Sequence, residues 1–314
     1  KEDEIDGKMV SQIISEEYRK AGMPPDMLGS GAVIITGESV KKRNARMVTE
    51  SIADLAGEFV VAAAGPDLES LLAGKGSGAA EVSRKEQNII LNLDIGGGTT
   101  NLCMFSDGKE MDFGCYDIGG RVIRYDQEHI VTAVTPKACA VLQQCGLPVR
   151  VGDVITEEKG ERIGRYFAEL LLQGANLLAP AQELKLLETN HGLTTDVTAD
   201  KFCFSGGVAD CIYKEYEDPF LYGDIGIFLG RAIRENAQWK KQKIVIAEET
   251  VRATVIGAGN CSMEVSGSTI YAKNAVYPVQ NLPVQKLYCR NDAEIATMDE
   301  QLEMLETQRT ETFE

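Results

Sequence analysis

The order of apolar and polar positions along the chain predicts alternating strands and helices. Residues 8–22 carry apolar side chains at the spacing of one helix face, and residues 32–36 form a short, continuously apolar run typical of a buried parallel strand. A helix is expected over residues 47–57, and a second buried strand over residues 59–64. Pro66 then lies in the first turn of a further helix, a favoured position for proline. Strand, helix, strand and helix in succession indicate an α/β fold.

A different pattern begins near residue 89 and predicts three consecutive strands. Residues 89–93 form an apolar strand that ends at Asp94, and a second strand is expected from Thr99 to residue 105. The Ser-Asp-Gly-Lys sequence at residues 106–109 has the composition of a β-hairpin turn. Residues 110–118 alternate well enough to form the third strand. Three strands joined by tight turns predict an antiparallel meander.

The second half of the chain predicts mainly helices, with short strands between them. A helix is expected over residues 121–125, and a longer one with an apolar stripe over residues 153–178. The other expected elements are helices over residues 180–187, from 208 and over 225–238, strands over 202–205, 244–247 and 254–256, and an acidic amphipathic helix near the C-terminus.

The glycine-rich segment after the first strand of the meander is the strongest candidate for chemistry. Three glycines permit a tight hairpin in which no Cβ atom blocks a ligand, and their N–H groups can point at phosphate oxygens. Asp94 can hold Mg²⁺ directly or through water, because hard cations prefer oxygen ligands. The candidate phosphate ligands are Gly96, Gly97, Gly98, Thr99 and Thr100. The alternative is a glycine-rich hairpin without a ligand, which the pattern Asp-x-Gly-Gly-Gly-Thr-Thr between two strands favours less.

Two further glycine pairs are weaker candidates. Ser205, Gly206 and Gly207 lead from a short strand into a helix, where the glycines would let the chain lie flat against a purine and ribose. By itself this pattern is equally typical of a plain strand-to-helix turn. Gly119 and Gly120 follow the third strand of the meander; part of a nucleotide cleft and a simple turn explain them equally well.

Charge and cysteine content narrow the classes of partner. The 314 residues carry a net charge of −16, a field that repels nucleic acid and anionic membrane surfaces. The eight cysteines form no Cys-x-x-Cys pair and lie mostly in apolar runs, which favours buried free thiols over disulfides or a zinc site. No apolar run approaches the 18 residues that a membrane helix requires.

The motifs together resemble the EutA family, the reactivating factors of ethanolamine ammonia-lyase. The segments that carry the resemblance are residues 34–39, 43–45, 64–70, 93–101, 253–259 and 264–269. The order of phosphate turn, diglycine and strand-Gly-Gly-helix is that of the actin, sugar-kinase and DnaK-type superfamily. The resemblance therefore implies an actin-like ATPase fold with two ribonuclease H-like lobes.

The resemblance also implies a function, a cofactor and a partner. Members of the family are ATP-dependent, chaperone-like factors that release damaged cobalamin from ethanolamine ammonia-lyase, so that intact adenosylcobalamin can bind. ATP or ADP with Mg²⁺ is therefore the expected ligand, and the lyase is the expected partner. Neither nucleic acid nor a membrane is expected as a partner, and a homodimer is compatible with the sequence. The expected location is the cytoplasm, in association with a bacterial microcompartment.

The sequence departs from the family pattern in its first lobe. No Asp-x-Gly-Thr-Thr turn precedes residue 94, so we expect residues 1–86 to be the remnant of a first actin-like lobe. Residues 87–292 would form the second lobe, and residues 293–314 an acidic helix or tail. A further C-terminal segment of the family is expected beyond this chain. We therefore expect a weak ATPase only in the longer protein, and little or no activity from this chain by itself.

The carboxylate that would orient the attacking water is a second departure. Related chaperones place Glu-Pro at the connector between the lobes, whereas Gly65 precedes Pro66 here. Glu69, one helical turn along, is the candidate for that role. Two other functions stay open at this point: a small-molecule kinase of the same superfamily, and a non-catalytic module that only binds a partner.

Overall fold

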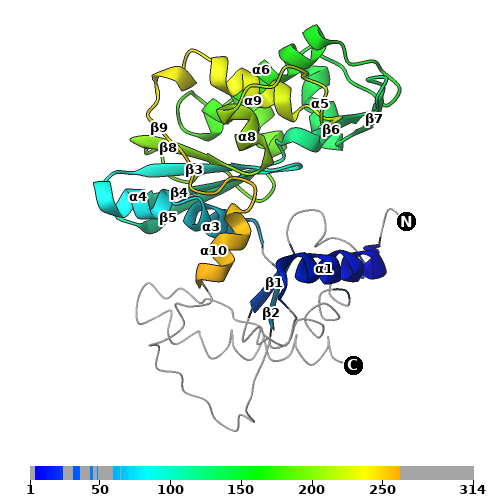
Figure 1. The fold of residues 1–314 in the computed structure, drawn as a ribbon. Coiled ribbons are helices and arrows are strands. Elements are labelled where there is room, and N and C mark those ends of the chain that lie inside the picture. The colour runs from blue at the N-terminus through cyan, green and yellow to red at the C-terminus, as the bar shows by residue number, and fades with distance from the viewer. Residues whose placement is uncertain are drawn as a thin grey trace, which may run out of the picture. The chain divides into compact units, whose positions relative to one another are not determined.

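The computed structural model describes residues 4–23, 31–35, 43–44, 48, 59–63 and 65–261 (Figure 1). The helices are α1 (Gly7–Ala21), α3 (Pro66–Gly76), α4 (Ala79–Glu86), α5 (Pro136–Gln144), α6 (Glu157–Gly174), α7 (Gln182–Leu187), α8 (Gly207–Tyr213), α9 (Gly226–Glu235) and α10 (Ala253–Cys261). The strands are β1 (Gly31–Ile35), β2 (Phe59–Ala63), β3 (Ile90–Ile95), β4 (Thr100–Ser106), β5 (Lys109–Tyr116), β6 (Ile123–Tyr125), β7 (Val131–Val134), β8 (Lys201–Ser205) and β9 (Ile244–Val245). The helices predicted over residues 47–57 and 293–314 lie outside the described residues.

The N-terminal elements agree with their sequence patterns. The carboxylate of Asp6 accepts a hydrogen bond from the N–H of Met9 and caps the start of α1, and Gly22 ends the helix with a φ of 65°. Glycine suits that position because a left-handed backbone strains other residues. The two apolar runs form β1 and β2, which pair in parallel. The predicted helix and both predicted strands are therefore confirmed.

A five-stranded sheet forms the centre of the second part, with the strand order β5-β4-β3-β8-β9. β4 is antiparallel to both β3 and β5, whereas β8 runs parallel to β3 and β9 parallel to β8. This confirms the predicted meander. The order and the directions are those of a ribonuclease H-like sheet, so the predicted α/β fold of the actin-like type is confirmed.

Helices cover both faces of this sheet (Figure 1). On one face, Leu91, Leu93 and Ile95 belong to a large apolar core that includes side chains of α5, α6 and α9. On the other face, Ile90 packs in a smaller core, and α3 and α4 lie against it. Because side chains alternate along a strand, Asp94 shares the face of Ile90 and lies on the side of α3 and α4.

The strand predicted over residues 254–256 is wrong, because these residues belong to helix α10. The apolar, partly β-branched sequence suggested a buried strand, but the segment packs as a helix against α3. The two helices approach closely through glycines. A Cβ atom on Gly76 would lie 1.8 Å from the carbonyl oxygen of Ala253, and one on Gly257 would lie 1.8 Å from that of Leu72. Only glycine permits this crossing.

Two other predictions need correction. Residues 121–125 do not form a helix: a short 3₁₀ turn (Gly120–Val122) leads into β6, which pairs with β7. The polar composition of residues 81–88 predicts a crossing between two domains, but the segment lies mostly in helix α4. Since α3 and α4 pack on the sheet of the second lobe, the polarity of α4 belongs to a solvent-facing helix surface. The lobe boundary at residue 86 stays a prediction.

Candidate functional site

The predicted phosphate turn connects β3 and β4 at one edge of the sheet. The N–H of Gly96 donates to the carbonyl of Thr99 at 2.9 Å and closes the hairpin. The N–H groups of Gly97, Gly98 and Thr99 have no hydrogen-bond partner among the residues that the structure describes. A Cβ atom on Gly98 would meet nothing within 4 Å. The turn therefore has three adjacent N–H groups without a partner among these residues and is open at Gly98, which suits an oxyanion ligand.

The diglycine Gly119 and Gly120 lies directly against this turn. The N–H of Gly120 donates to the carbonyl of Gly96 at 3.0 Å. A Cβ atom on Gly119 would lie 2.5 Å from the carbonyl oxygen of Gly97, so only glycine fits there. The structure thus brings the diglycine to the candidate site. Its hydrogen bond supports the phosphate turn, so Gly120 has no N–H left for a ligand.

Arg121 is a functional candidate that the sequence analysis missed. Its N–H donates to the carbonyl of Gly97 at 2.6 Å, and its side chain runs beside the same glycine. The residue is exposed, so its guanidinium group is available to an anion. The sequence feature that could have indicated an anion site here is the succession Gly-Gly-Arg directly after a strand. The same residues also predict the start of a helix.

The two threonines of the motif have different environments. Thr100 is fully buried, and its hydroxyl donates to the carbonyl of Ile118 at 2.7 Å. It therefore ties β4 to the segment that carries the diglycine. Thr99 is half-buried at the end of the turn, closer to the open donors of Gly97 and Gly98.

The second glycine motif meets the first because β8 lies beside β3. In the register of the two parallel strands, Ser205 is the partner of Asp94. Gly206 follows with a φ of 84°, and a Cβ atom there would lie 2.4 Å from the carbonyl oxygen of Ile95, so a side chain is excluded twice. Gly207 is exposed, with nothing within 4 Å of a Cβ atom. Of the two glycines, Gly207 is the one that faces open space.

Asp94 and Ser205 form a hydrogen-bonded pair at the centre of this arrangement. The Ser205 hydroxyl donates to Oδ1 of Asp94 at 2.7 Å. Burial raises the pKa of Asp94 to about 6, and the hydrogen bond from Ser205 lowers it in part. Oδ2 of Asp94 accepts no hydrogen bond from the described residues. The carboxylate therefore keeps one oxygen for a further ligand.

This donor set fits Mg²⁺ better than a metal held by the protein alone. Within the described part of the chain, no three His, Cys, Asp or Glu side chains come close enough to hold a metal ion. Mg²⁺ usually keeps several waters and binds through one or two carboxylates and the phosphates of a nucleotide. One buried carboxylate beside an open turn of N–H donors matches that pattern. Asp94 is the residue that would hold the ion.

Glu69 lies in the first turn of α3. Its N–H donates to the carbonyl of Gly65 at 2.9 Å, the first hydrogen bond of the helix. Burial raises the pKa of the Cys115 thiol, and the charge of Glu69 adds to that increase. Helix α3 packs against β4 and β5, the strands that carry Asn101 and Cys115. The thiol of Cys115 donates to Oδ1 of Asn101 at 2.9 Å, and Asn101 is the partner of Asp94 in the strand register. Glu69 is thus on the correct side of the sheet, and its role stays a prediction.

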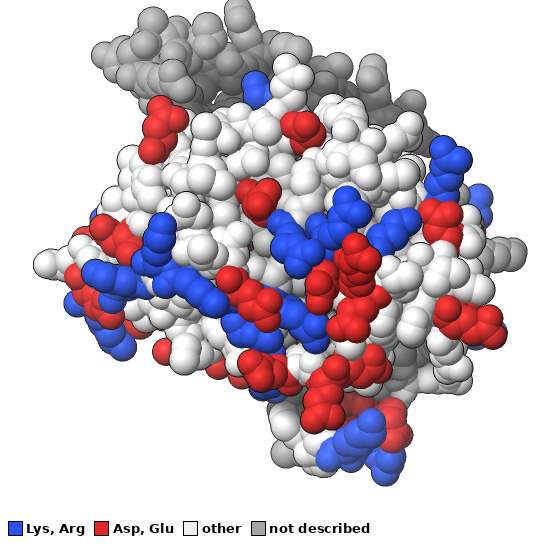
Figure 2. All heavy atoms as spheres, turned by 90° about the horizontal axis from the view of Figure 1, so that it is seen from above, with Lys and Arg blue, Asp and Glu red and all other residues white. Residues whose placement is uncertain are grey.

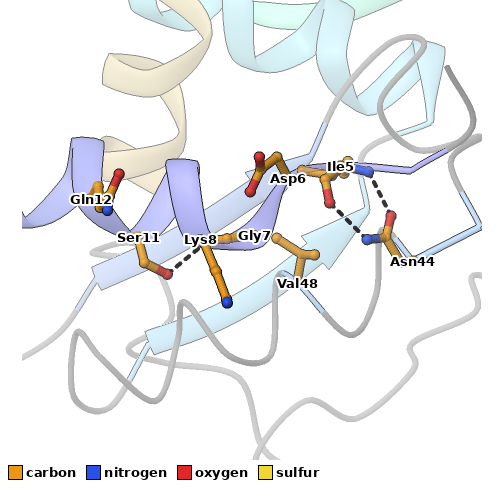
Figure 3. A pocket seen from close by; sticks show the side chains of 8 residues that line it. All are labelled: Ile5, Asp6, Gly7, Lys8, Ser11, Gln12, Asn44 and Val48. Carbon is orange, nitrogen blue, oxygen red and sulfur yellow. Dashed lines mark hydrogen bonds between the residues drawn. The ribbon is translucent and has the colours of Figure 1, made fainter. Parts of the chain in front are cut away.

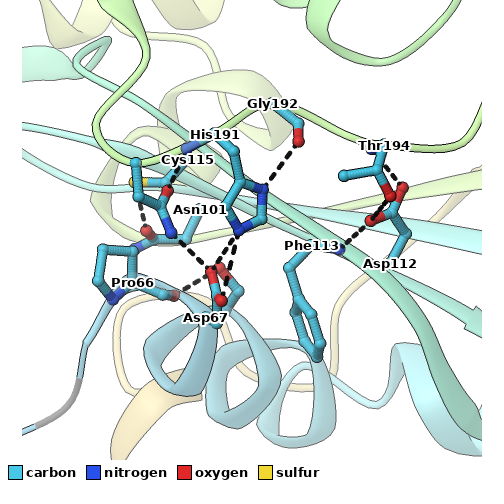
Figure 4. Close-up of polar contacts among 11 residues, drawn as sticks. Pro66, Asp67, Asn101, Asp112, Phe113, Cys115, His191, Gly192 and Thr194 are labelled. Carbon is cyan, nitrogen blue, oxygen red and sulfur yellow. Dashed lines mark hydrogen bonds and ion pairs between the residues drawn. The ribbon is translucent and has the colours of Figure 1, made fainter. Parts of the chain in front are cut away.

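A polar cluster fastens the start of α3 to the segment after α7 (Figure 4). Nε2 of His191 lies 3.3 Å from a carboxylate oxygen of Asp67, and Nδ2 of Asn190 donates to the same carboxylate at 2.8 Å. The carbonyl of Gly192, 2.9 Å from Nδ1, raises the pKa of His191, and Asp67 raises it further. The carbonyl of His191 also accepts a hydrogen bond from the N–H of Cys115. Helix α3, named the connector helix because it begins at the Gly65-Pro66 position, is therefore held at its N-terminal end.

A separate hollow of about 640 Å³ lies at the start of α1 (Figure 3). The side chain of Asn44 bonds the N–H and the carbonyl of Ile5, at 2.7 and 2.8 Å. The carboxylate of Asp6 is occupied by its helix cap. None of the predicted site residues lines this hollow, and its polar groups serve the local structure.

Comparison with known proteins identifies relatives over the whole chain. The family model described as ethanolamine utilisation protein EutA matches residues 1–314. The ethanolamine ammonia-lyase reactivase EutA of Salmonella typhimurium is 38% identical over 274 residues, and that of Escherichia coli is 37% identical over 273 residues. Each match covers 87% of this chain and 58% of the relative. The chain therefore spans little more than half the length of these relatives.

Solved structures resemble the chain at low sequence identity. A Ppx/GppA family protein of Aquifex aeolicus has a TM-score of 0.45 at 13% identity, over 83% of both chains. The ethanolamine utilisation protein EutJ of Carboxydothermus hydrogenoformans has a TM-score of 0.37 at 17% identity, over 81% of this chain and 74% of that one. In the described part of the chain, none of the helices has the length and apolarity to cross a membrane.

Proposed function

The chain belongs to the EutA family of ethanolamine utilisation proteins, and from that premise we propose that it serves as an ATP-dependent reactivating factor for ethanolamine ammonia-lyase. The two relatives from Salmonella typhimurium and Escherichia coli are ethanolamine ammonia-lyase reactivases by name, which supports the lyase as the partner. The observation that carries the nucleotide role is the meeting of Asp94, the open glycine turn and Gly207 at one edge of the sheet. Two motifs more than a hundred residues apart converge there, which a plain hairpin would not require.

Each part of the nucleotide has a candidate partner in this arrangement. The free N–H groups of Gly97, Gly98 and Thr99 would bind phosphate oxygens, and the exposed guanidinium of Arg121 would add positive charge beside them. Asp94 would hold Mg²⁺, which neutralises phosphate charge when it is bound. The open surface at Gly207 would accept the nucleoside. These contacts come from the second lobe only.

Hydrolysis would need a group that orients water toward the terminal phosphate. Glu69 is the candidate because it lies in the first turn of α3, near the strands that carry Asn101 and Cys115. Transfer of the phosphoryl group to water gives ADP and inorganic phosphate, with positioning and charge as the main contributions of the protein. A slow ATPase of this kind serves as a switch between two states of the protein.

Coupling to the lyase follows from the two-lobed architecture. Nucleotide state would set the closure of the lobes, and closure would change the affinity for the lyase. A lyase bound by one state would release its damaged cobalamin, and intact adenosylcobalamin could then enter. We propose that this takes place in the cytoplasm, in association with a bacterial microcompartment.

The surface charge favours a protein partner over nucleic acid. The net charge of the chain is −16. On the face shown in Figure 2, Lys and Arg are interspersed with Asp and Glu. Several charged side chains of the described residues pair, as Arg231 does with Glu157 and Glu161. A surface of this kind offers no broad basic patch to a phosphate backbone. A cationic region on the lyase would complement the acidic excess, and a homodimer is compatible with the same charge.

ATP turnover by the full-length gene product tests the nucleotide role. Asp94→Asn keeps the shape of the side chain and removes the charge that would hold Mg²⁺, so turnover should fall by about 100-fold. Asp112→Asn is the matched control, because Asp112 is as buried as Asp94. Its carboxylate accepts hydrogen bonds from the N–H groups of Phe113, Thr194 and Thr195 and from the Thr194 hydroxyl, none of which belongs to the glycine turn. Equal turnover by wild type and Asp94→Asn would rule out the assignment.

The same preparations separate the two alternative functions. A small-molecule kinase would transfer the phosphoryl group to an added alcohol, whereas the proposed ATPase releases inorganic phosphate. A module that only binds a partner would show no heat of binding with Mg·ATP in calorimetry. Binding together with phosphate release supports the reactivating factor over both.

A further inference from the structure

Four polar side chains are buried together between the sheet and the turn that joins α3 to α4. Asn92 and Ser205 are fully buried, Ser77 is 1% exposed and Asp94 is 7% exposed. Apolar side chains surround them, among them Ile90, Cys103 and Cys203. Buried polar groups are costly unless every one has a partner. Their presence in a place that apolar residues could fill calls for a specific reason.

These side chains form one chain of hydrogen bonds that ends on Asp94. The Ser77 hydroxyl lies 2.9 Å from Oδ1 of Asn92 and 3.1 Å from the carbonyl of Gly74, and Asn92 is the nearer acceptor for its one proton. Nδ2 of Asn92 donates to the Ser205 hydroxyl at 3.0 Å. The Ser205 hydroxyl donates to Oδ1 of Asp94 at 2.7 Å. With Ser77 as a donor, every donor points toward the carboxylate, so each bond polarises the next in the same sense.

Backbone hydrogen bonds also join the turn after α3 to the turn after β8. The N–H of Glu248 donates to the carbonyl of Ser77 at 2.9 Å, and the carbonyl of Thr250 accepts from the N–H of Gly206 at 3.0 Å. The Thr250 hydroxyl donates to Asp210 in α8 at 2.8 Å. The turn after α3 and the turn after β8 are therefore connected twice, once through side chains and once through residues 248–250.

Ser77 is anchored to the connector helix, whose place is tightly fixed. Its N–H donates to the carbonyl of Ala73 at 2.8 Å, which continues the hydrogen bonding of α3. The preceding residue, Gly76, touches the backbone of α10 so closely that no side chain fits. A displacement of Ser77 therefore requires movement of α3 against α10. Conversely, movement of α3 would displace Ser77 and change its hydrogen bond to Asn92.

We propose that Ser77, Asn92 and Ser205 are positioning residues that fix the Asp94 carboxylate and couple it to the C-terminal end of α3. The proposal rests on the proposed function in one respect, namely that Asp94 is the residue that meets the Mg²⁺-nucleotide. Ser205 holds one carboxylate oxygen, which leaves the other directed to a ligand. Asn92 and Ser77 make the orientation of that carboxylate depend on the position of the connector helix.

A double-mutant cycle on the stability of this chain tests the coupling. Asp94→Ala, Ser77→Ala and the double variant are compared with wild type in urea, without metal or nucleotide. The effects of two substitutions on the unfolding equilibrium constant multiply when the two sites are independent. They depart from that product when both residues belong to one hydrogen-bond network. The unfolding equilibrium constant of the double variant should depart at least about threefold from the product of the single effects. Agreement with that product would overturn the proposal.

Ser83→Ala is the matched control for this cycle. Ser83 is also fully buried, and its hydroxyl donates to the carbonyl of Asn88. It takes no part in the series of hydrogen bonds that ends on Asp94. Its cycle with Asp94→Ala should be multiplicative within about twofold. Coupling of Ser83 as strong as that of Ser77 would mean a general effect on the fold and would also overturn the proposal.

A spectroscopic measurement keeps the test valid if a double variant does not fold. The side-chain amide signals of Asn92 in NMR should move in both Ser77→Ala and Asp94→Ala, and stay in place in Ser83→Ala. Unchanged signals in either of the first two variants would contradict the proposal. Mg·ATP binding is scored separately, on the full-length gene product: a coupled cycle without nucleotide binding by that protein supports the positioning role and counts against the proposed function.

Discussion

Replacing Asp94 with asparagine should change how stability depends on pH, because the carboxyl group is buried. Burial raises the pKa of Asp94 to about 6 in the folded protein, against the smaller lowering effect of Ser205. An aspartate in an unfolded chain has a pKa of about 3.9. The folded state therefore binds the proton more tightly than the unfolded state. Between these two pKa values, the free energy of unfolding falls as the pH rises.

The size and the direction of the effect follow from these two values. A pKa difference of about 2 corresponds to about 3 kcal/mol. This contribution to stability is present below pH about 4 and is lost as the pH rises through about 6. Asparagine has the same shape and does not titrate. Between pH 4, where the unfolded carboxyl is already about half-ionised, and pH 7, the stability of Asp94→Asn relative to wild type should therefore rise by about 2 kcal/mol.

Urea unfolding with a metal chelator present measures this difference at each pH. The fluorescence of Trp239 is a suitable probe, because it is the one tryptophan of the chain and is buried. Its ring lies 5.6 and 5.3 Å from those of Phe202 and Phe204, in the strand next to Asp94. Ser83→Ala removes no titrating group and should give a difference that is constant with pH. A constant difference for Asp94→Asn, or one of opposite sign, would refute the reasoning.

Three further predictions concern the packing around the site. Gly206→Ala should destabilise the protein by at least about 2 kcal/mol in urea unfolding, because it adds backbone strain and a clash, whereas Gly207→Ala should change stability by less than about 1 kcal/mol. Gly257→Ala should likewise destabilise the protein by at least about 2 kcal/mol, since its Cβ atom would overlap the backbone of α3. Asp67→Asn should lower the pKa of His191 in an NMR titration, because it removes the carboxylate that helps to raise it.

Controls for these changes exist within the same elements. Gly259→Ala adds a methyl group to α10 where a Cβ atom meets nothing within 4 Å, so its effect should stay within about 1 kcal/mol. Loss of stability as large as that of Gly257→Ala would show that the close approach of Gly257 to α3 does not explain its effect. The signal of His129, the other histidine of the chain, is the internal control for the titration.

The meander and its glycine turn could be predicted from sequence because local signals agree there. Apolar runs over residues 89–93 and 99–105, a hairpin turn and three glycines all require the same chain path. The meeting of Asp94 with Ser205 could not be derived from spacing. It depends on β8 pairing with β3, a contact between segments more than a hundred residues apart, and only the family resemblance indicated it.

The errors arise where distant contacts override local preference. Residues 254–256 are predicted as a strand because they are apolar and partly β-branched, but they belong to helix α10, whose glycines allow it to cross α3. Residues 121–125 read as a helix because their partner strand β7 was not recognised. The alternation of Asn92 and Asp94 within an apolar strand was a signal for a buried polar network. Its partners Ser77 and Ser205 are visible only in the folded chain.

The release of damaged cobalamin from inactivated ethanolamine ammonia-lyase tests the central claim most directly. The full-length gene product would be mixed with the inactivated lyase and Mg²⁺, with and without ATP, and free cobalamin would be measured by absorbance after filtration. We predict release that requires ATP, is lost in Asp94→Asn and is retained in Asp112→Asn. Release that is equally fast without ATP, or equally fast in Asp94→Asn, would contradict the account.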